Sequence, residues 1–89
     1  MSTVTKSFTG TETDTQHLTP PPGTMDVSVT GTFVGTVVLE RTLDGTNWGI
    51  CATYTTATED VITNGSGSVP YRFRCSAYTS GTINCAMTY

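Results

Sequence analysis

The sequence predicts an all-β protein: a single small antiparallel β-sandwich of about seven strands, with an extended N-terminal arm. Three observations lead to this prediction. Alternating apolar and polar residues recur in short runs, turn-forming residues separate the runs, and no stretch has the 3.6-residue period of an amphipathic helix. A small barrel would give the same pattern and is the alternative architecture.

The composition indicates one domain that gains stability from association. The chain has 89 residues, of which 12% are charged, and 21 threonines supply much of its polarity. Threonine favours strands and keeps a hydroxyl group for water. The core of so small a domain barely offsets the entropy of ordering the chain, and edges with few charges resist strand pairing poorly. We therefore expect a homo-oligomer, with a trimer favoured.

The charge pattern excludes several classes of partner. With four cations, seven anions and a net charge of −3, the chain lacks the clustered basic residues that bind a phosphate backbone. We therefore expect no nucleic-acid partner. No apolar stretch approaches the length that spans a membrane, and the first residues lack the apolar core of a secretory signal.

The N-terminal part differs from the rest in composition. Residues 2–9 alternate as an edge strand, whereas residues 10–24 have little to bury and contain three consecutive prolines that favour an extended polyproline II conformation. We divide the chain into an N-terminal strand and polar Pro-rich arm (1–24) and a sandwich core (25–89). Two interpretations of the arm remain open: it packs on a neighbouring subunit, or it is an ordinary exposed crossing loop.

The middle of the chain predicts four strands and one clear hairpin. Asp44-Gly45 lies between two β runs, which is a strong short-range hairpin signal. Closing the chain there pairs Leu39 with Ala52 and Val37 with Tyr54, but it places Arg41 opposite Ile50. We therefore expect either a bulge or a stem packed over Trp48. A flexible turn is expected at 64–68. The strands are expected at 25–32, 33–42, 48–55 and 58–64.

The last 21 residues predict a second hairpin. Two alternating runs meet at the turn-forming residues 79–81, and folding the chain there pairs Phe73 with Met87 and Cys75 with Cys85 on an apolar face. The two arginines of the first run, Arg72 and Arg74, then face solvent. The facing cysteines leave two interpretations open, a disulfide or two small buried hydrophobic side chains.

No arrangement of residues predicts catalysis or metal binding. His17 is the only histidine and stands in the polar arm without a nucleophile near it. Glu59 and Asp60 point to opposite faces of a strand, so they cannot act as the paired carboxylates of a glycosidase. Asp44 is interpreted as a turn residue, and no Cys/His spacing predicts zinc. We expect no enzyme activity, no cofactor and no metal.

Two stretches resemble the small β-sandwich virion proteins of tailed bacteriophages. The first is GTFVGTVVLERTLDGTNW, starting at Gly31, and the second is YRFRCSAYTSGT, ending at Thr82. The resemblance implies a non-enzymatic structural protein of the virion: a capsid decoration or head-associated protein that binds and reinforces the particle as an oligomer. It also implies assembly in the host cytoplasm and contact with major capsid or tail proteins.

Other functions remain open beside this one. The protein could be a tail-associated or carbohydrate-binding host-recognition module that uses exposed aromatic side chains, or a freestanding interaction module without a viral connection. On the virion hypothesis, the polar arm and the outward hairpin face supply the contacts. The candidate contact residues are Lys6, His17, Pro20, Pro21, Pro22, Arg72, Arg74 and Tyr78.

Overall fold

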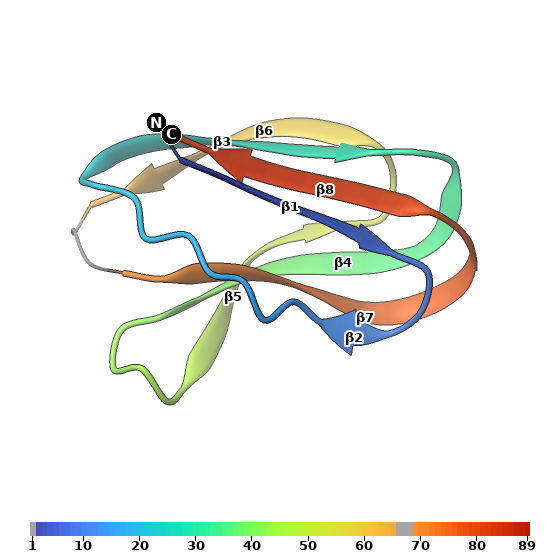
Figure 1. The fold of residues 1–89 in the computed structure, drawn as a ribbon, viewed down its shortest axis with the longest axis horizontal. Helices are drawn as coiled ribbons and strands as arrows, with labels where there is room; N and C mark the ends of the chain where they lie inside the picture. The colour runs from blue at the N-terminus through green and yellow to red at the C-terminus, as the bar shows by residue number, and fades with distance from the viewer. Residues whose placement is uncertain (1, 66–68) are drawn as a thin grey trace.

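The computed structural model describes residues 2–65 and 69–89 and confirms an all-β fold in which two antiparallel four-stranded sheets pack face to face (Figure 1). Sheet A has the strand order β1-β8-β3-β6, and sheet B has the order β2-β7-β4-β5. The strands are β1 (Thr3–Phe8), β2 (Glu12–Thr13), β3 (Gly23–Thr30), β4 (Phe33–Thr42), β5 (Trp48–Tyr54), β6 (Thr58–Asn64), β7 (Tyr71–Gly81) and β8 (Ile83–Thr88).

The connections between the strands define a jelly roll. Every connection except β4–β5 crosses from one sheet to the other, which is the eight-stranded, double-sheet arrangement of that architecture. The alternating residues of each strand therefore meet between the sheets. Fully buried core side chains come from both sheets and include Phe8, Met25, Val29, Val37, Leu39, Tyr71, Phe73, Ile83 and Met87. No helix in the described part of the chain is long and apolar enough to cross a membrane.

The predicted C-terminal hairpin is wrong, although the inward side chains were assigned correctly from Tyr71 to Cys75 and from Ile83 to Met87. Ala77 was expected inward and is exposed, because the β4–β7 register shifts beside it. Tyr71–Gly81 pairs with β4 and β2 in sheet B, whereas Ile83–Thr88 pairs with β1 and β3 in sheet A. Phe73 and Met87 are both buried, but they belong to opposite sheets. Alternation determines which side chains point inward and leaves the partner strand open, so a corner between two sheets and a hairpin have the same sequence pattern.

Glycine makes the corner between β7 and β8 possible. Gly81 has φ +91°, and a Cβ atom there would collide with the Thr32 carbonyl oxygen and lie 2.7 Å from Phe33 Cα. Gly31, with φ +109°, lies at the corner between β3 and β4, and a Cβ atom there would collide with the Thr82 carbonyl oxygen. Gly31 therefore marks a sharp bend between two strands, and the two corners pack backbone against backbone.

The hairpin predicted around Asp44-Gly45 is confirmed. Val37 pairs with Tyr54 and Leu39 with Ala52, as expected, and then the register shifts so that Glu40 pairs with Ile50. The shift leaves Cys51 as the extra residue of the expected bulge. The hairpin end extends out of the sandwich in Figure 1. Of the turn expected at 64–68, residues 66–68 lie outside the described part of the chain.

Residues 2–24 take part in both sheets of their own chain. Strand β1 forms an edge of sheet A with Val4 and Phe8 in the core. The chain then crosses to sheet B, where β2 and the segment after it run along the edge of β7. The Asp14 N–H donates to the Phe73 carbonyl at 3.0 Å, and Leu18 and Tyr71 exchange two backbone hydrogen bonds. This segment therefore covers the β7 edge that would otherwise be open to strand pairing.

Candidate interaction surface

The turn between β4 and β5 is held by one carboxylate. Asp44 accepts four hydrogen bonds, from the Thr46 and Asn47 N–H groups, the Asn47 side-chain amide and the Thr42 hydroxyl, at 2.8–3.1 Å. These donors stabilise the charged form, and they hold the pKa of Asp44 well below its ordinary value. Gly45 accommodates the sharp bend with φ +84°. Trp48 therefore starts β5 in a fixed position.

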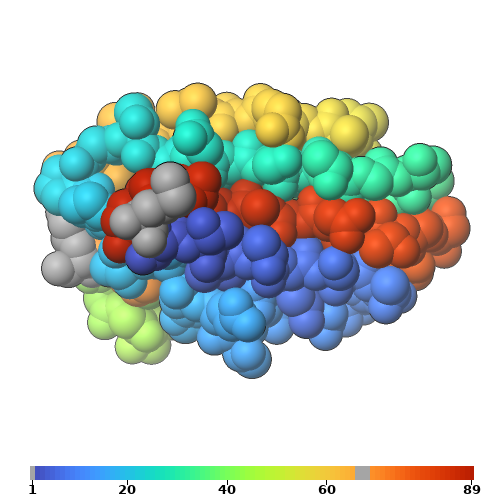
Figure 2. All heavy atoms as spheres, turned by 45° about the horizontal axis from the view of Figure 1, so that its top comes forward, coloured from blue at the N-terminus to red at the C-terminus, as the bar shows by residue number. Residues whose placement is uncertain are grey.

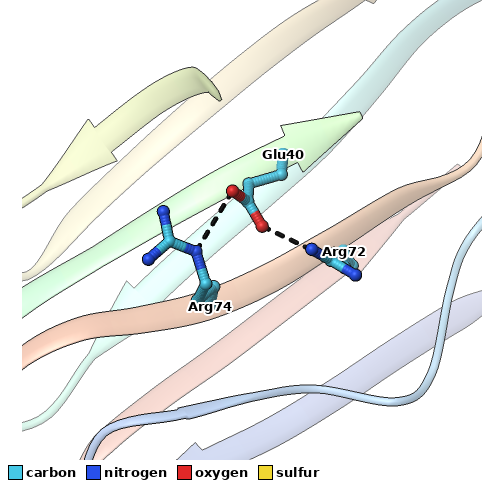
Figure 3. Close-up of polar contacts among 3 residues, drawn as sticks. All are labelled: Glu40, Arg72 and Arg74. Atoms are coloured by element: carbon cyan, nitrogen blue, oxygen red, sulfur yellow. Dashed lines mark hydrogen bonds and ion pairs between the residues drawn. The ribbon is translucent and has the colours of Figure 1, made fainter. Parts of the chain in front are cut away.

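The outer face of sheet B holds a buried carboxylate between two arginines (Figure 3). Glu40 lies directly opposite Arg72 in the β4–β7 register, and Arg74 is the next outward residue of β7. Each arginine donates from Nε to one oxygen of Glu40, both at 3.1 Å. Glu40 is only 4% exposed, because its neighbours cover it. Both arginine side chains remain partly exposed.

Aromatic rings extend this cluster toward the hairpin. The guanidinium of Arg72 lies 3.9 Å from the centre of the Trp48 ring, a stacking arrangement that favours cation–π attraction. The His17 ring lies 4.9 Å from Trp48 at a tilt of 59°. His17 reaches this position because the neighbouring Leu18 pairs with Tyr71. We call the row of His17, Trp48, Arg72, Glu40 and Arg74 the outer strip.

The outer strip has the chemistry of a protein-contact surface. Two arginines and one glutamate give it one net positive charge on a chain whose net charge is −3. Arginine and tryptophan are enriched among the residues that contribute most to binding at protein interfaces. The Nε groups hold Glu40, which leaves the remaining guanidinium donors for an acidic or carbonyl group of a partner.

The structure brings three of the predicted contact residues together and separates the others. His17, Arg72 and Arg74 belong to the outer strip, but the two arginines do not stand free in solvent as expected. Lys6 lies on β1, the edge strand of sheet A, and its ammonium pairs with Glu12 of β2 at 3.2 Å across the two sheets. Tyr78 was expected to project outward, and this is wrong: its ring packs partly buried against the core, and its hydroxyl donates to the Gly81 carbonyl.

The three prolines form a bend beside the end of β6. Pro20 is buried, while Pro21 and Pro22 are exposed. The Asn64 side-chain amide donates to the Pro20 carbonyl at 3.1 Å and to the Pro21 carbonyl at 3.4 Å. Asn64 is itself buried and accepts from the Tyr71 hydroxyl. The proline segment is thus anchored to its own chain, with two ring faces left for a partner.

The cysteines are free thiols in this structure. Cys75 and Cys85 are buried on opposite sheets, so the geometry corresponds to the second interpretation, two small hydrophobic side chains. Burial raises the pKa of the Cys85 thiol to about 12. Cys51 is exposed in the bulge of β5, and partial desolvation raises the pKa of its thiol as well.

Two buried acids escaped the sequence analysis. Glu40 was assigned no role beyond that of one of seven acidic residues. Its position opposite Arg72 would have indicated an ion pair once β4 and β7 were known to be neighbours. Asp14 lies in a segment too polar to suggest burial, yet it is 3% exposed. One of its oxygens accepts from the Gln16 N–H, and the other has no hydrogen-bond partner.

In residues 2–65 and 69–89, no group of three or more His, Cys, Asp or Glu side chains is arranged to hold a metal ion.

Two large hollows lie on the surface of the protein. A cleft of about 690 Å³ lies beside the β4–β5 hairpin, and its lining includes Arg41, Leu43, Trp48, Ile50 and Ile62. A second hollow, of about 680 Å³, lies on the outer face of sheet A and is lined by residues of β1, β3, β6 and β8. Both are open to solvent, as contact surfaces are.

Comparison with known proteins extends to the fold alone. No family model matches the chain, and no curated protein matches its sequence. Among solved structures, the chain is similar to the crystal structure of Yersinia pseudotuberculosis-derived mitogen (YPM), with a TM-score of 0.60 and 14% sequence identity. The similarity covers 98% of this chain and 83% of the mitogen chain, so the two proteins share a β-fold along almost the whole of this sequence.

Proposed function

We propose that the protein is a non-enzymatic structural protein of a tailed-bacteriophage virion, a capsid decoration or head-associated protein that binds and reinforces the particle as an oligomer. The resemblance of residues 31–82 to small virion proteins of such phages supports this proposal. So does the architecture, because double-sheet jelly rolls are used by viral capsid domains. Lectins and cupins use them too, so the docking surface has to carry the argument.

The single observation that carries the proposal is the rigid outer strip. Long arginine side chains normally lose rotamer freedom when they are immobilised at an interface, which reduces affinity. Here the Nε–Glu40 contacts at 3.1 Å and the stacking on Trp48 already restrict Arg72, and Glu40 restricts Arg74 in the same way. A partner that accepts hydrogen bonds from these two guanidinium groups therefore meets donors that are held in place before binding.

Co-sedimentation of the purified protein with capsids and with tails that were assembled without it tests this proposal. We expect saturable binding to capsids that weakens about five- to thirtyfold in Arg74→Gln, as expected for loss of one well-placed interface residue. Lys6→Gln removes the same charge outside the outer strip, on β1 of the other sheet, and should leave binding unchanged. Thermal melting of each variant separates lost binding from lost folding.

Two outcomes would overturn the proposal. Absence of binding to both particle parts by a folded protein would remove the virion function. Binding of the isolated protein to glycans, lost in Trp48→Ala, would instead favour the host-recognition module. Binding to tails and not to capsids would retain the virion role and move the protein to the tail.

A further inference from the structure

Exposed apolar side chains gather on two separate surfaces. Among residues 2–65 and 69–89, the large apolar side chains that are mostly exposed are Val34, Leu43, Ile50 and Val61, at 58%, 76%, 58% and 58%. Leu43 and Ile50 lie on the β4–β5 hairpin, and Val61 lies on the outer face of sheet A. Single exposed apolar residues need no explanation, but these three stand beside charges of opposite sign.

The first surface is the projecting β4–β5 hairpin, whose side chains also line the cleft beside it and include a cation at the base. We call Arg41, Leu43 and Ile50 the knob. The hairpin extends out of the sandwich (Figure 1), and the four hydrogen bonds to Asp44 fix its turn. Arg41 has no carboxylate within ion-pair distance in the described part of the chain, unlike the other cations Lys6, Arg72 and Arg74. The negative charge of Asp44 is directed into its own turn.

The second surface is a shallow hollow with only negative charge. Figure 2 looks toward the face on which β6, β3, β8 and β1 run side by side. The hollow there is lined by Asp26, Glu59, Val61 and Ala86, among others. Asp26 and Glu59 are exposed, and the Ser28 hydroxyl donates to one Glu59 oxygen and orients it. The outward residues of these strands include no lysine or arginine.

We propose that the knob of one copy of this protein seats in the hollow of a second copy. Arg41 would then pair with Asp26 and Glu59, while Leu43 and Ile50 would cover Val61 and Ala86. One contact would thus remove three of these four exposed apolar side chains from water and give Arg41 a carboxylate partner. The contact joins two different surfaces, so it is heterologous, and repetition around an axis closes a ring.

Strand pairing between copies explains these features less well. The free edge of β6 carries Glu59 and Asp60, which would meet like charges in a symmetric pair. The free edge of β5 is interrupted by the bulge at Cys51, a feature that protects edges from pairing. Neither arrangement would use Arg41.

The inference deepens the oligomeric part of the proposed function, but it concerns the isolated protein and needs no particle.

Sedimentation velocity and light scattering on the isolated protein test the proposal. We expect a discrete oligomer whose dissociation constant rises about tenfold or more in Leu43→Glu and in Glu59→Arg, because each places a like or buried charge at the contact. Val34→Glu alters an equally exposed apolar residue of β4 outside both surfaces and should associate as the wild type does. Leu43 and Glu59 are exposed, so these variants should melt near the wild-type temperature.

Charge exchange tests the pairing itself. Arg41→Glu alone should dissociate the oligomer, and the double variant Arg41→Glu/Glu59→Arg should restore it. Neither single variant should associate alone, but an equimolar mixture of the two should associate with the variants alternating, because both contacts between unlike variants join opposite charges. A monomeric wild type, an oligomer indifferent to Leu43→Glu, or failure of the double variant to recover would overturn the inference. Association without capsid binding would refute the proposed function and leave this inference standing.

Discussion

Replacing Gly81 by alanine tests the corner that distinguishes this fold from a terminal hairpin. Gly81 has φ +91°, where an L-residue costs about 1–2 kcal/mol. The new Cβ atom would also collide with the Thr32 carbonyl oxygen and lie 2.7 Å from Phe33 Cα. Relieving such overpacking by backbone movement costs about 1–3 kcal/mol. The free energy of unfolding should therefore fall by about 2–5 kcal/mol, a large share of a typical total of about 5–15 kcal/mol.

Gly45→Ala is the matched control. Gly45 has a similar φ of +84°, but a Cβ atom there meets no atom within 4 Å. The control should therefore lose only the backbone contribution of about 1–2 kcal/mol. The difference between the two variants, about 1–3 kcal/mol, isolates the close approach of the corners.

Urea unfolding followed by Trp48 fluorescence measures both variants. For a small protein with an m-value of about 1 kcal/mol/M, the midpoints of the two variants should differ by about 1–3 M. If Gly81→Ala does not fold while Gly45→Ala does, the same reasoning holds. Equal midpoints would refute it, because a simple β7–β8 hairpin brings no Thr32 carbonyl to Gly81.

Two further predictions concern titratable groups. The folded-state pKa of Asp44 is lowered, so the wild type should be more stable than Asp44→Ala, by the full amount above about pH 4, the ordinary range of a carboxyl group. This difference in the free energy of unfolding should shrink as the pH falls below that range. Urea midpoints of both proteins between acid and neutral pH would measure it, and a pH-independent difference would contradict the prediction. Iodoacetamide at pH 8 should label the exposed Cys51 well before Cys85, whose buried thiol has a pKa of about 12; peptide mass spectrometry would show the order, and equal rates in the folded protein would contradict it.

Local signals predicted the parts of the fold that depend on local sequence. The β4–β5 hairpin follows from Asp44-Gly45 and from the alternation on either side, and its pairs were correct up to the bulge. The bounds of Phe33–Thr42 and Thr58–Asn64 were also correct. In each case, neighbouring residues in the sequence carry the information: turn residues at the ends and a period of two between them.

The jelly-roll connections could not be predicted because they are not local. The first part of β7, from Tyr71 to Cys75, would present the same inward side chains in a hairpin with β8 or beside β4. The choice depends on the whole set of strands and on corner contacts such as that between Gly81 and Thr32. Likewise, Asp14 lies in a segment that composition marks as exposed, and it is buried because the backbone there pairs with Phe73.

Glu40 connects the fold to the candidate surface. A buried carboxylate loses solvation, and its two ion pairs compensate for that loss only in part, so an apolar residue of similar volume would often serve stability as well. Stability alone therefore explains poorly why a 4% exposed glutamate stands between Arg72 and Arg74 on an outer face. Its position does explain why both guanidinium groups are fixed in direction while their remaining donors stay accessible. We therefore propose that this costly feature prepares the surface for a partner, with particle docking on the outer strip and self-association through the knob and the hollow.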